Sequence, residues 1–214
     1  MGEINIHDEF GSNIYKTVID CNLHRILEIG SWDGTGSTSC FISALSCLKS
    51  PSLTCIEIQP DRYKDLVSNT KHISWVKCIN NSTISYMSFI VGDFEAVWNS
   101  KYNHIPRHNT KKETVNTWYD EDISNIKQCN IGALEIDNTF YDGVLIDGSE
   151  FTGYSEFALL KNRCNVFFLD DYYNAFKTRQ VVEELNSDPN WEVIAGNKHL
   201  RNGYAIFKRK VFLS

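Results

Sequence analysis

The sequence predicts an α/β domain with a largely parallel sheet. Short apolar runs alternate with segments of helical periodicity, as a parallel sheet with crossover helices requires. Two of these runs, 143–146 and 165–169, end in acidic residues, which is typical of buried parallel strands that present side chains at the carboxyl edge of a sheet. With 214 residues the chain is long enough for one well-buried domain and short for two. We therefore expect a single domain over residues 1–214.

Hydrophobic periodicity and the residues that start and stop helices give the elements in order. The first half is predicted to contain a helix over 14–22, a strand over 25–29, a glycine-rich turn, a helix over 37–48, a strand over 53–58, a helix that begins at Pro60 and a strand over 73–79. Residues 80–83 break that last strand and are suited to cap a helix over 85–98. Gly92 and Asp93 interrupt the helical pattern, so a second turn there remains an alternative.

The second half opens with a polar segment over 99–130. Long irregular insertions in compact domains are often lids or binding loops, and a solvated surface helix is the alternative. The predicted elements that follow are a strand over 143–146, a helix over 154–160, a strand over 165–169, a helix over 178–186 and two strands, 191–195 and 204–208. The turn 196–198 is expected to join these last two strands as a hairpin.

Composition and charge argue against several functional classes. A formal net charge of −6 disfavours nucleic acid as a partner, because phosphate binding normally needs a basic face. The amino-terminal residues are acidic where a secretory signal is basic, and no apolar run is long enough to span a bilayer, so we expect a cytoplasmic protein. The seven cysteines include no Cys-x-x-Cys pair, which favours free thiols over a zinc site or a disulfide framework.

Three aspartates follow the two acidic strands and carry the main chemical signal. Asp147 comes directly after the strand 143–146, and Asp170 and Asp171 come directly after the strand 165–169. Carboxylates packed close together repel one another unless a cation neutralises them, and oxygen ligands suit a hard divalent ion such as Mg²⁺. The alternative is that Asp170 and Asp171 cap the next turn and Asp147 contacts only a cofactor.

A glycine-rich turn joins the first strand to the second helix. Glycines let the backbone approach a ligand closely, and amides at a helix start favour a negatively charged group. The spacing of Gly30, Gly34 and Gly36 departs from the dinucleotide fingerprint, and no P-loop is present, which favours another nucleoside-bearing cofactor over NAD or ATP. Glu57 ends the next strand, where an acid accepts hydrogen bonds from ribose hydroxyls in nucleoside-binding α/β folds. The candidate cofactor contacts around this turn are Glu28, Gly30, Ser31, Asp33 and Gly34.

On these motifs the chain resembles the class I S-adenosylmethionine-dependent methyltransferases. The resemblance runs from the Glu-x-Gly-x-x-x-Gly turn through Glu57 and Tyr-Asp-Gly-Val-Leu-Ile-Asp-Gly to the closing hairpin. It is strongest to the metal-dependent O-methyltransferases of the catechol type and of macrolide and aminocoumarin sugar modification. The resemblance implies a Rossmann-like, doubly wound sheet of seven strands, mostly parallel with the last antiparallel, and helices on both faces.

The resemblance also implies roles for individual residues. Magnesium would be held by Asp147, Asp170 and Asp171, and Asp147 would also contact the cofactor. Glu57 would bind the ribose of S-adenosylmethionine and Ser82 would lie near its adenine, while the turn from Gly30 to Gly36 would surround the methionine part.

One position departs from this group. Three residues after the first metal aspartate the group carries a lysine or histidine as general base, whereas this chain has Glu150. A glutamate can serve as the base if its pKa is raised towards the working pH. An extra metal ligand and a spectator are the alternatives, and Lys177, His104 or His108 could supply a base from another loop.

We therefore expect a magnesium-assisted transfer of a methyl group from S-adenosylmethionine to a hydroxyl of a sugar or glycan, with Asp147, Glu150 and Asp171 as the catalytic residues. The substrate would be a small molecule or carbohydrate, and the state of oligomerisation is left open. Two alternatives remain. One is a metal-free small-molecule methyltransferase of the same fold, and the other is a non-catalytic nucleoside-binding or assembly protein.

Overall fold

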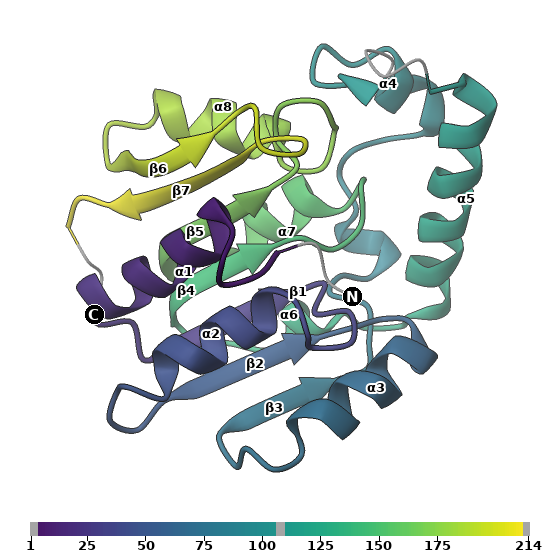
Figure 1. Cartoon of the computed structure of the whole chain (residues 1–214). Helices are drawn as coiled ribbons and strands as arrows, with labels where there is room; N and C mark the ends of the chain where they lie inside the picture. Colours follow the sequence, from purple (N-terminus) through teal and green to yellow (C-terminus); the bar gives the residue numbers. More distant parts are fainter. Residues whose placement is uncertain (1–3, 106–109, 212–214) are drawn as a thin grey trace.

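A seven-stranded sheet runs through the centre of the computed structural model, which describes residues 4–105 and 110–211 (Figure 1). The strand order is β3-β2-β1-β4-β5-β7-β6, and β7 runs antiparallel to both of its neighbours. The predicted fold class is thereby confirmed. The strands are β1 (Arg25–Ile29), β2 (Ser52–Ile56), β3 (Val76–Ile79), β4 (Tyr141–Ile146), β5 (Cys164–Asp170), β6 (Trp191–Asn197) and β7 (Tyr204–Arg209).

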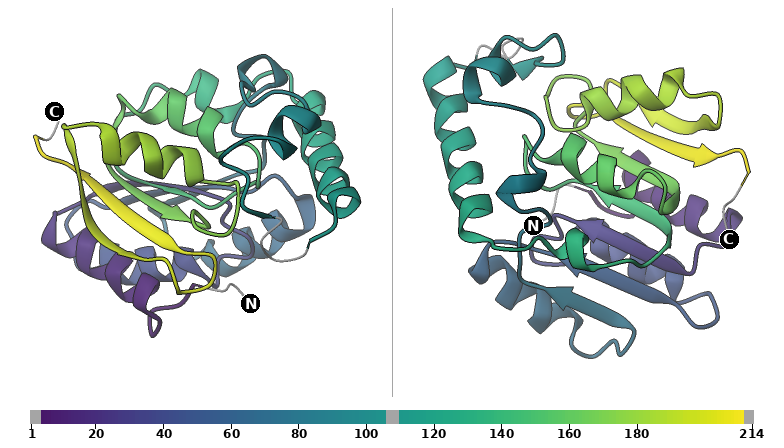
Figure 2. Two further views of the ribbon diagram at one scale, coloured as in Figure 1. Left: turned by 90° about the horizontal axis from the view of Figure 1, so that it is seen from above. Right: turned by 180° about the vertical axis from the view of Figure 1, so that it is seen from behind.

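Helices cover both faces of this sheet (Figure 2). One face packs against α1, α2 and α3, and the other packs against α7 and α8, so that each face has its own apolar core. The helices are α1 (Glu9–Asp20), α2 (Ser37–Leu45), α3 (Pro60–Thr70), η1 (Tyr86–Ser88), α4 (Phe94–Trp98), α5 (Lys112–Gln128), α6 (Ala133–Ile136), α7 (Gly153–Leu160) and α8 (Arg179–Ser187). No helix in the described ranges is both long and apolar enough to cross a membrane.

The central strands carry apolar side chains on both faces of the sheet, and helices cover both faces. Ile26 packs into the core beneath α1 and α2, whereas Leu27 faces the core beneath α7 and α8, as the alternation of side chains along a strand requires. All seven residues of β5 are buried. Such continuous apolar runs are what parallel strands need, and they explain why the sequence located β4 and β5 well.

The segment before α5 shows the largest difference from the expected elements. A continuous helix over 85–98 is not formed, because Gly92 adopts a positive φ of 97° and Asp93 starts a new helix by accepting a hydrogen bond from the Ala96 amide at 2.9 Å. Helix α1 begins five residues earlier than the expected residue 14, because Asp8 caps it by accepting a hydrogen bond from the Gly11 amide.

Helix α5 stands beyond the carboxyl edge of the sheet, apart from the two main helix layers (Figures 1 and 2). It presents an apolar stripe to a third, smaller core that includes Phe151 and Phe176 from the loops after β4 and β5. The stripe repeats at helical spacing and consists of Val115, Tyr119, Ile123 and Ile126. The polar segment 99–130 therefore has one buried face, which packs beside the loops that carry the predicted chemistry.

Candidate active site

The turn after β1 brings two backbone segments into contact at the carboxyl edge of the sheet. Gly30 has a φ of 85°, and a Cβ placed there would lie 2.3 Å from the carbonyl oxygen of Asp147. Only glycine fits this position, since any side chain would collide with backbone and the φ is unfavourable for other residues. The close approach positions Asp147 beside the turn, and the Asp147 amide donates to the Ile29 carbonyl at 3.0 Å.

Glu28 lies beneath this turn and supports it. Its side chain is fully buried, and its carboxylate accepts hydrogen bonds from the hydroxyls of Ser37 and Thr38 at 2.6 Å each. Burial raises the pKa of Glu28, and these hydrogen bonds oppose that shift. Glu28 therefore fixes the start of α2 against β1 and lies outside the cavity wall.

Asp33 and Gly34 also stabilise the turn from outside the cavity. Asp33 accepts hydrogen bonds from the amide and the hydroxyl of Thr35 at 2.9 and 2.6 Å. Gly34 has a φ of 80°, and a Cβ placed there would lie 2.9 Å from the Leu66 side chain of α3. These residues shape the turn without reaching the cavity.

A cavity of about 530 Å³ opens at this edge of the sheet. That size lies within the range of small-molecule sites. The turn, the ends of β2, β4 and β5, the segment after β3 and one side of α5 form its wall. The predicted site residues that line it are Gly30, Ser31, Glu57, Ser82, Asp147, Asp170 and Asp171.

Glu57 directly follows β2, is buried, and accepts hydrogen bonds from two backbone amides. Its Oε2 accepts from the Trp32 amide at 2.9 Å and its Oε1 from the Gln59 amide at 2.8 Å. Burial raises the pKa of Glu57, against the effect of these two hydrogen bonds. Ser82 lies on the wall after β3, where its hydroxyl donates to the Ile84 carbonyl at 2.6 Å.

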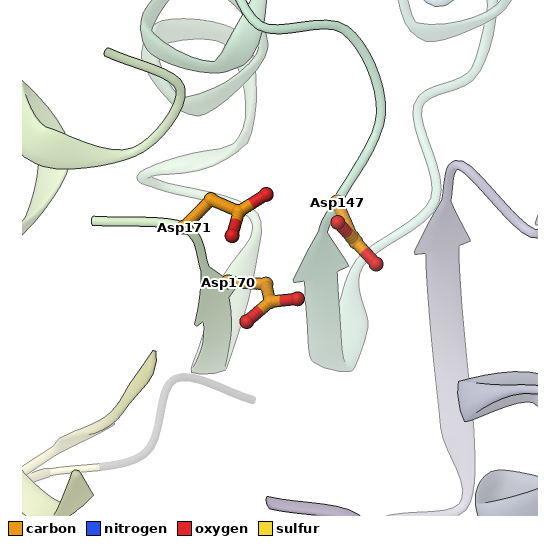
Figure 3. A group of neighbouring side chains, drawn as sticks. All are labelled: Asp147, Asp170 and Asp171. Carbon is orange, nitrogen blue, oxygen red and sulfur yellow. The ribbon is translucent and has the colours of Figure 1, made fainter. Parts of the chain in front are cut away.

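The three predicted aspartates converge, as Figure 3 shows. Asp147 follows β4, Asp170 ends β5 and Asp171 follows it with a φ of 56°. One carboxylate oxygen from each lies within 4.8 Å of the others. The parallel pairing of β4 with β5 brings these side chains to one point.

Two basic side chains compensate this negative charge. The ammonium of Lys177 contacts Oδ1 of Asp147 at 2.9 Å and Oδ2 of Asp171 at 2.8 Å, and its side chain is only 10% exposed. Arg201, in the turn between β6 and β7, lies 3.6 Å from Oδ1 of Asp170. That distance is too long for a hydrogen bond, and Oδ1 of Asp170 has no hydrogen-bond partner among the described residues.

The sequence predicts a dication as the charge that neutralises the three carboxylates. In the structure, the side chains of Lys177 and Arg201 supply part of the neutralising positive charge. The pKa values of the aspartates reflect both burial and these neighbouring charges. Burial and the neighbouring carboxylates raise the pKa of Asp170 well above its usual value. Burial acts to raise the pKa of Asp171 as well, but Lys177, Asn202 and Arg201 together outweigh it and lower the pKa below its usual value.

Glu150 lies behind this cluster and positions the loop that carries Lys177. Its Oε1 accepts from the amides of Phe176 and Lys177 at 2.5 and 3.2 Å. Burial raises the pKa of Glu150 to about 7, and Lys177 opposes that shift. His104 is directed elsewhere, because its Nδ1 pairs with the Tyr173 carbonyl at 2.9 Å. His108 lies outside the described residues.

Two further acids on the wall were not predicted from the sequence. Glu156 of α7 is buried, and its Oε1 accepts from the hydroxyls of Thr83 and Thr152 at 2.5 and 2.8 Å, while its Oε2 has no hydrogen-bond partner among the described residues. Asp122 of α5 accepts from the Ser149 hydroxyl. A signal for Glu156 was present, since it is the one acid inside the apolar helix 154–160.

The charged residues on the wall are mostly acidic. Among the residues that the structure describes, six acids line the cavity, against the two basic residues Arg62 and Lys177. Such a wall favours cationic or neutral ligands over anions. The acids are Glu57, Asp122, Asp147, Glu156, Asp170 and Asp171.

The fold is shared with solved methyltransferase structures. The O-methyltransferase from Bacillus cereus in complex with SAH superposes with a TM-score of 0.59 at 12% identity, covering 97% of this chain and 84% of that one. The chain has the fold of the class I methyltransferases. Cofactor-bound Rv0187 from MTB gives a TM-score of 0.61 at 12% identity over 98% of this chain and 84% of that one. TomG from Streptomyces achromogenes, an O-methyltransferase involved in tomaymycin synthesis and solved with SAM, gives 0.58 at 12% identity over 97% and 82%. No family model and no curated protein sequence matches the chain.

Proposed function

We propose that the protein is an S-adenosylmethionine-dependent O-methyltransferase that acts on a small molecule. The observation that carries this proposal is the convergence of the glycine turn, Glu57 and the three aspartates on one cavity at the carboxyl edge of the sheet. Ligands bind at this edge in open α/β sheets. The similarity of the fold to O-methyltransferases solved with SAM or SAH adds support.

The charge of the cavity is compatible with this cofactor. S-Adenosylmethionine carries a sulfonium, an ammonium and a carboxylate group, so its net charge is positive, and the acidic wall complements the two cationic groups. We assign the ribose to Glu57, the adenine to the segment around Ser82, and the methionine part to the turn at Gly30 and Ser31, with Asp147 beside it. Glu28, Asp33 and Gly34 hold that turn in shape from behind.

The acidic cluster has the donor chemistry of a magnesium site. One oxygen from each of the three carboxylates lies within 4.8 Å of the others. The buried Oδ1 of Asp170 has no hydrogen-bond partner among the described residues, and a bound cation would give this oxygen a partner. Asp147, Asp170 and Asp171 would hold the ion. When bound, Mg²⁺ would lower the pKa of an acceptor hydroxyl and orient it. We propose a sugar or glycan with neighbouring hydroxyls as the acceptor, because two such oxygens can share one metal.

The protein's own groups exclude water and accept the proton. Ile4 and Ile126 are buried on the cavity wall, and exclusion of water favours a reaction in which the sulfonium loses its charge. Glu150 is the proposed proton acceptor, since its pKa of about 7 lies near neutral pH. It lies outside the cavity wall, so the proton would pass through Lys177, which interacts with Glu150 and donates a hydrogen bond to Asp147. Lys177 would give one of its protons to Glu150 and take up the proton of the acceptor hydroxyl in its place.

A metal-free methyltransferase is the second candidate, and one observation favours it. The Lys177 ammonium already bridges Asp147 and Asp171, so the cluster can hold an acceptor hydroxyl without a metal ion. In that case the carboxylates would accept a hydrogen bond from the hydroxyl and orient it. The two candidates share the cofactor and differ in their need for magnesium.

Calorimetric titration tests the proposal. S-Adenosylmethionine, S-adenosylhomocysteine and NAD are each titrated with and without Mg²⁺. We expect both sulfur nucleosides to bind and NAD not to bind. If neither S-adenosylmethionine nor S-adenosylhomocysteine binds, the methyltransferase proposal is wrong. Turnover that does not depend on Mg²⁺ would favour the second candidate.

Substitution of the cluster tests the assigned roles. Asp171→Ala should abolish methyl transfer and leave the affinity for S-adenosylhomocysteine nearly unchanged, because Asp171 is assigned to the metal and acceptor side of the cavity. Asp61→Ala is the matched control, since Asp61 is exposed and pairs with Lys64 on the surface of α3. Full activity of Asp171→Ala would contradict the assignment.

A further inference from the structure

Two cysteines face each other across the edge of the sheet. Cys55 on β2 and Cys78 on β3 are in register in this parallel pair, and β3 is the edge strand (Figure 1). Cys55 is buried, and Cys78 is half-buried. Cys78 also contacts the Thr70 hydroxyl of α3 at 3.3 Å.

The backbone spacing at this position suits a disulfide. Neighbouring strands lie about 4.7–4.9 Å apart, and disulfides join residues whose Cα atoms are about 4.4–6.8 Å apart. Residues in register on neighbouring strands also point to the same face of the sheet, so the two side chains lie beside each other.

The two thiols differ in reactivity in the way that disulfide formation needs. The pKa of Cys78 is lowered to about 6, chiefly by a hydrogen bond from Cys55. Burial raises the pKa of Cys55 well above its usual value. Cys78 on the edge strand is therefore the thiolate that meets an oxidant, and Cys55 is the protonated partner behind it.

Cys55 is also connected to the turn of the active site. Its thiol donates to Oε2 of Glu28 at 3.4 Å, and the same carboxylate accepts from Ser37 and Thr38 at the start of α2. The Cys55 thiol therefore lies between the Glu28 carboxylate and Cys78, its register partner on β3. A disulfide has no proton to donate, so oxidation would remove one hydrogen bond from a buried carboxylate that supports the turn.

We propose that Cys55 and Cys78 form a peroxide-sensitive thiol pair that closes into a disulfide and loosens the glycine turn above Glu28. The Cys78 thiolate attacks one oxygen of hydrogen peroxide, the O–O bond breaks, and hydroxide leaves, which gives a sulfenic acid. The Cys55 sulfur then attacks the sulfenic sulfur and water leaves, which gives the disulfide. The proton of Cys55 leaves with this water, and the hydroxide from the first step takes up the proton that Cys78 released on ionisation. In sum, two thiols are oxidised, one peroxide is reduced and two waters form. A thiol reductant reverses the change.

Peptide mapping tests the disulfide without reference to function. Trypsin releases Cys55 in the peptide 50–62 and Cys78 in the peptide 78–101, and neither contains a second cysteine. After treatment with hydrogen peroxide and blocking of free thiols, these two peptides should appear as one linked species that disappears on reduction. A Cys78 that carries only sulfenic or sulfinic acid, or that pairs with another cysteine, would overturn the proposal.

Three variants provide the controls. Cys55→Ser and Cys78→Ser should each prevent the link. Cys47→Ser should leave it intact, since Cys47 is exposed and lies in the turn after α2, away from β2 and β3. Cys78→Ser also controls for oxidation of Met87, which is 90% exposed and which peroxide would modify equally in both proteins.

The effect on the turn is measured in two ways. Hydrogen exchange at amides 30–36 should become faster in the oxidised protein and stay unchanged in peroxide-treated Cys78→Ser. The second readout rests on the proposed function: the affinity for S-adenosylhomocysteine should fall about tenfold on oxidation, as expected for the loss of one hydrogen bond to a buried charge. If the reduced protein does not bind this nucleoside, the proposed function fails, while the link and the exchange rates still decide whether the thiol pair acts on the turn. A link that changes neither the exchange nor the affinity would overturn the connection to the turn.

Discussion

Replacing Lys177 by methionine tests the electrostatics of the site most sharply. Lys177 is 10% exposed and bridges two carboxylates at 2.9 and 2.8 Å, so its removal leaves buried charges without their partner. Removing one partner of a buried ion pair costs about 3–5 kcal/mol. Because Asp147 and Asp171 are each about one fifth exposed, we expect the lower end of that range, about 3 kcal/mol at neutral pH.

The assay is equilibrium unfolding in urea, followed by circular dichroism. With an m-value of about 2–3 kcal/mol per molar, the midpoint should fall by about 1 M. Lys161→Met is the matched control. Lys161 pairs with Glu184 and Asp188 at 2.8 and 3.0 Å but is 27% exposed, and such a surface pair contributes at most about 1 kcal/mol.

Added magnesium makes the same experiment more discriminating. A ligand that binds only the folded state stabilises it in proportion to the logarithm of its concentration over its dissociation constant. Magnesium should therefore stabilise Lys177→Met more than the unaltered protein, because the variant offers the same carboxylates without a competing ammonium. If Lys177→Met lost no more stability than Lys161→Met, the proposed charge compensation within the buried cluster would be refuted.

Three further predictions concern the turn, the cavity wall and a helix start. Gly30→Ala should lower stability by about 2–4 kcal/mol in urea unfolding and abolish nucleoside binding, because its Cβ would lie 2.3 Å from the Asp147 carbonyl oxygen; unchanged binding would contradict the geometry of the turn. Burial raises the pKa of Glu156 from 4.5 to about 6, so the folded state binds this proton more tightly than the unfolded state does. The protonated side chain therefore contributes about 2 kcal/mol to the free energy of unfolding below pH 4.5, and this contribution is lost as the pH rises through about 6. Glu156→Gln should remove this slope from a plot of unfolding free energy against pH, and an unaltered slope would show that another group causes it. Asp93→Ala should cost about 1 kcal/mol in the same unfolding assay through loss of the α4 cap, and a variant as stable as the parent would show that Asp93 does not hold the helix start.

The sequence predicted the parts of the site that follow from the strands themselves. The carboxyl ends of parallel strands meet at one edge, so Asp147 and Asp170 could be placed together from two apolar runs alone. Glu57 reached the cavity wall for the same reason, since it directly follows β2.

The parts that depend on distant loops could not be predicted in the same way. Arg201 reaches Asp170 from a turn after β6, and no local pattern links the two residues. The sequence offers Lys177 only as a possible base from another loop, because its place between two carboxylates depends on the loop after β5, which Glu150 holds through backbone amides. Glu28 sits inside a strand and not at its end, so its orientation beneath the turn depends on the packing of α2.

The most direct test of the central claim is a crystal structure of the protein grown with S-adenosylhomocysteine and Mg²⁺. We expect the nucleoside in the cavity, with its ribose hydroxyls on Glu57 and its sulfur directed towards Asp147, and an ion among the three aspartates. A nucleoside bound elsewhere, or a cavity that stays empty at saturating ligand, would contradict the claim that this edge of the sheet is a methyl-transfer site. A bound nucleoside without an ion, with Lys177 still bridging Asp147 and Asp171, would support the methyltransferase proposal and contradict the proposed magnesium site.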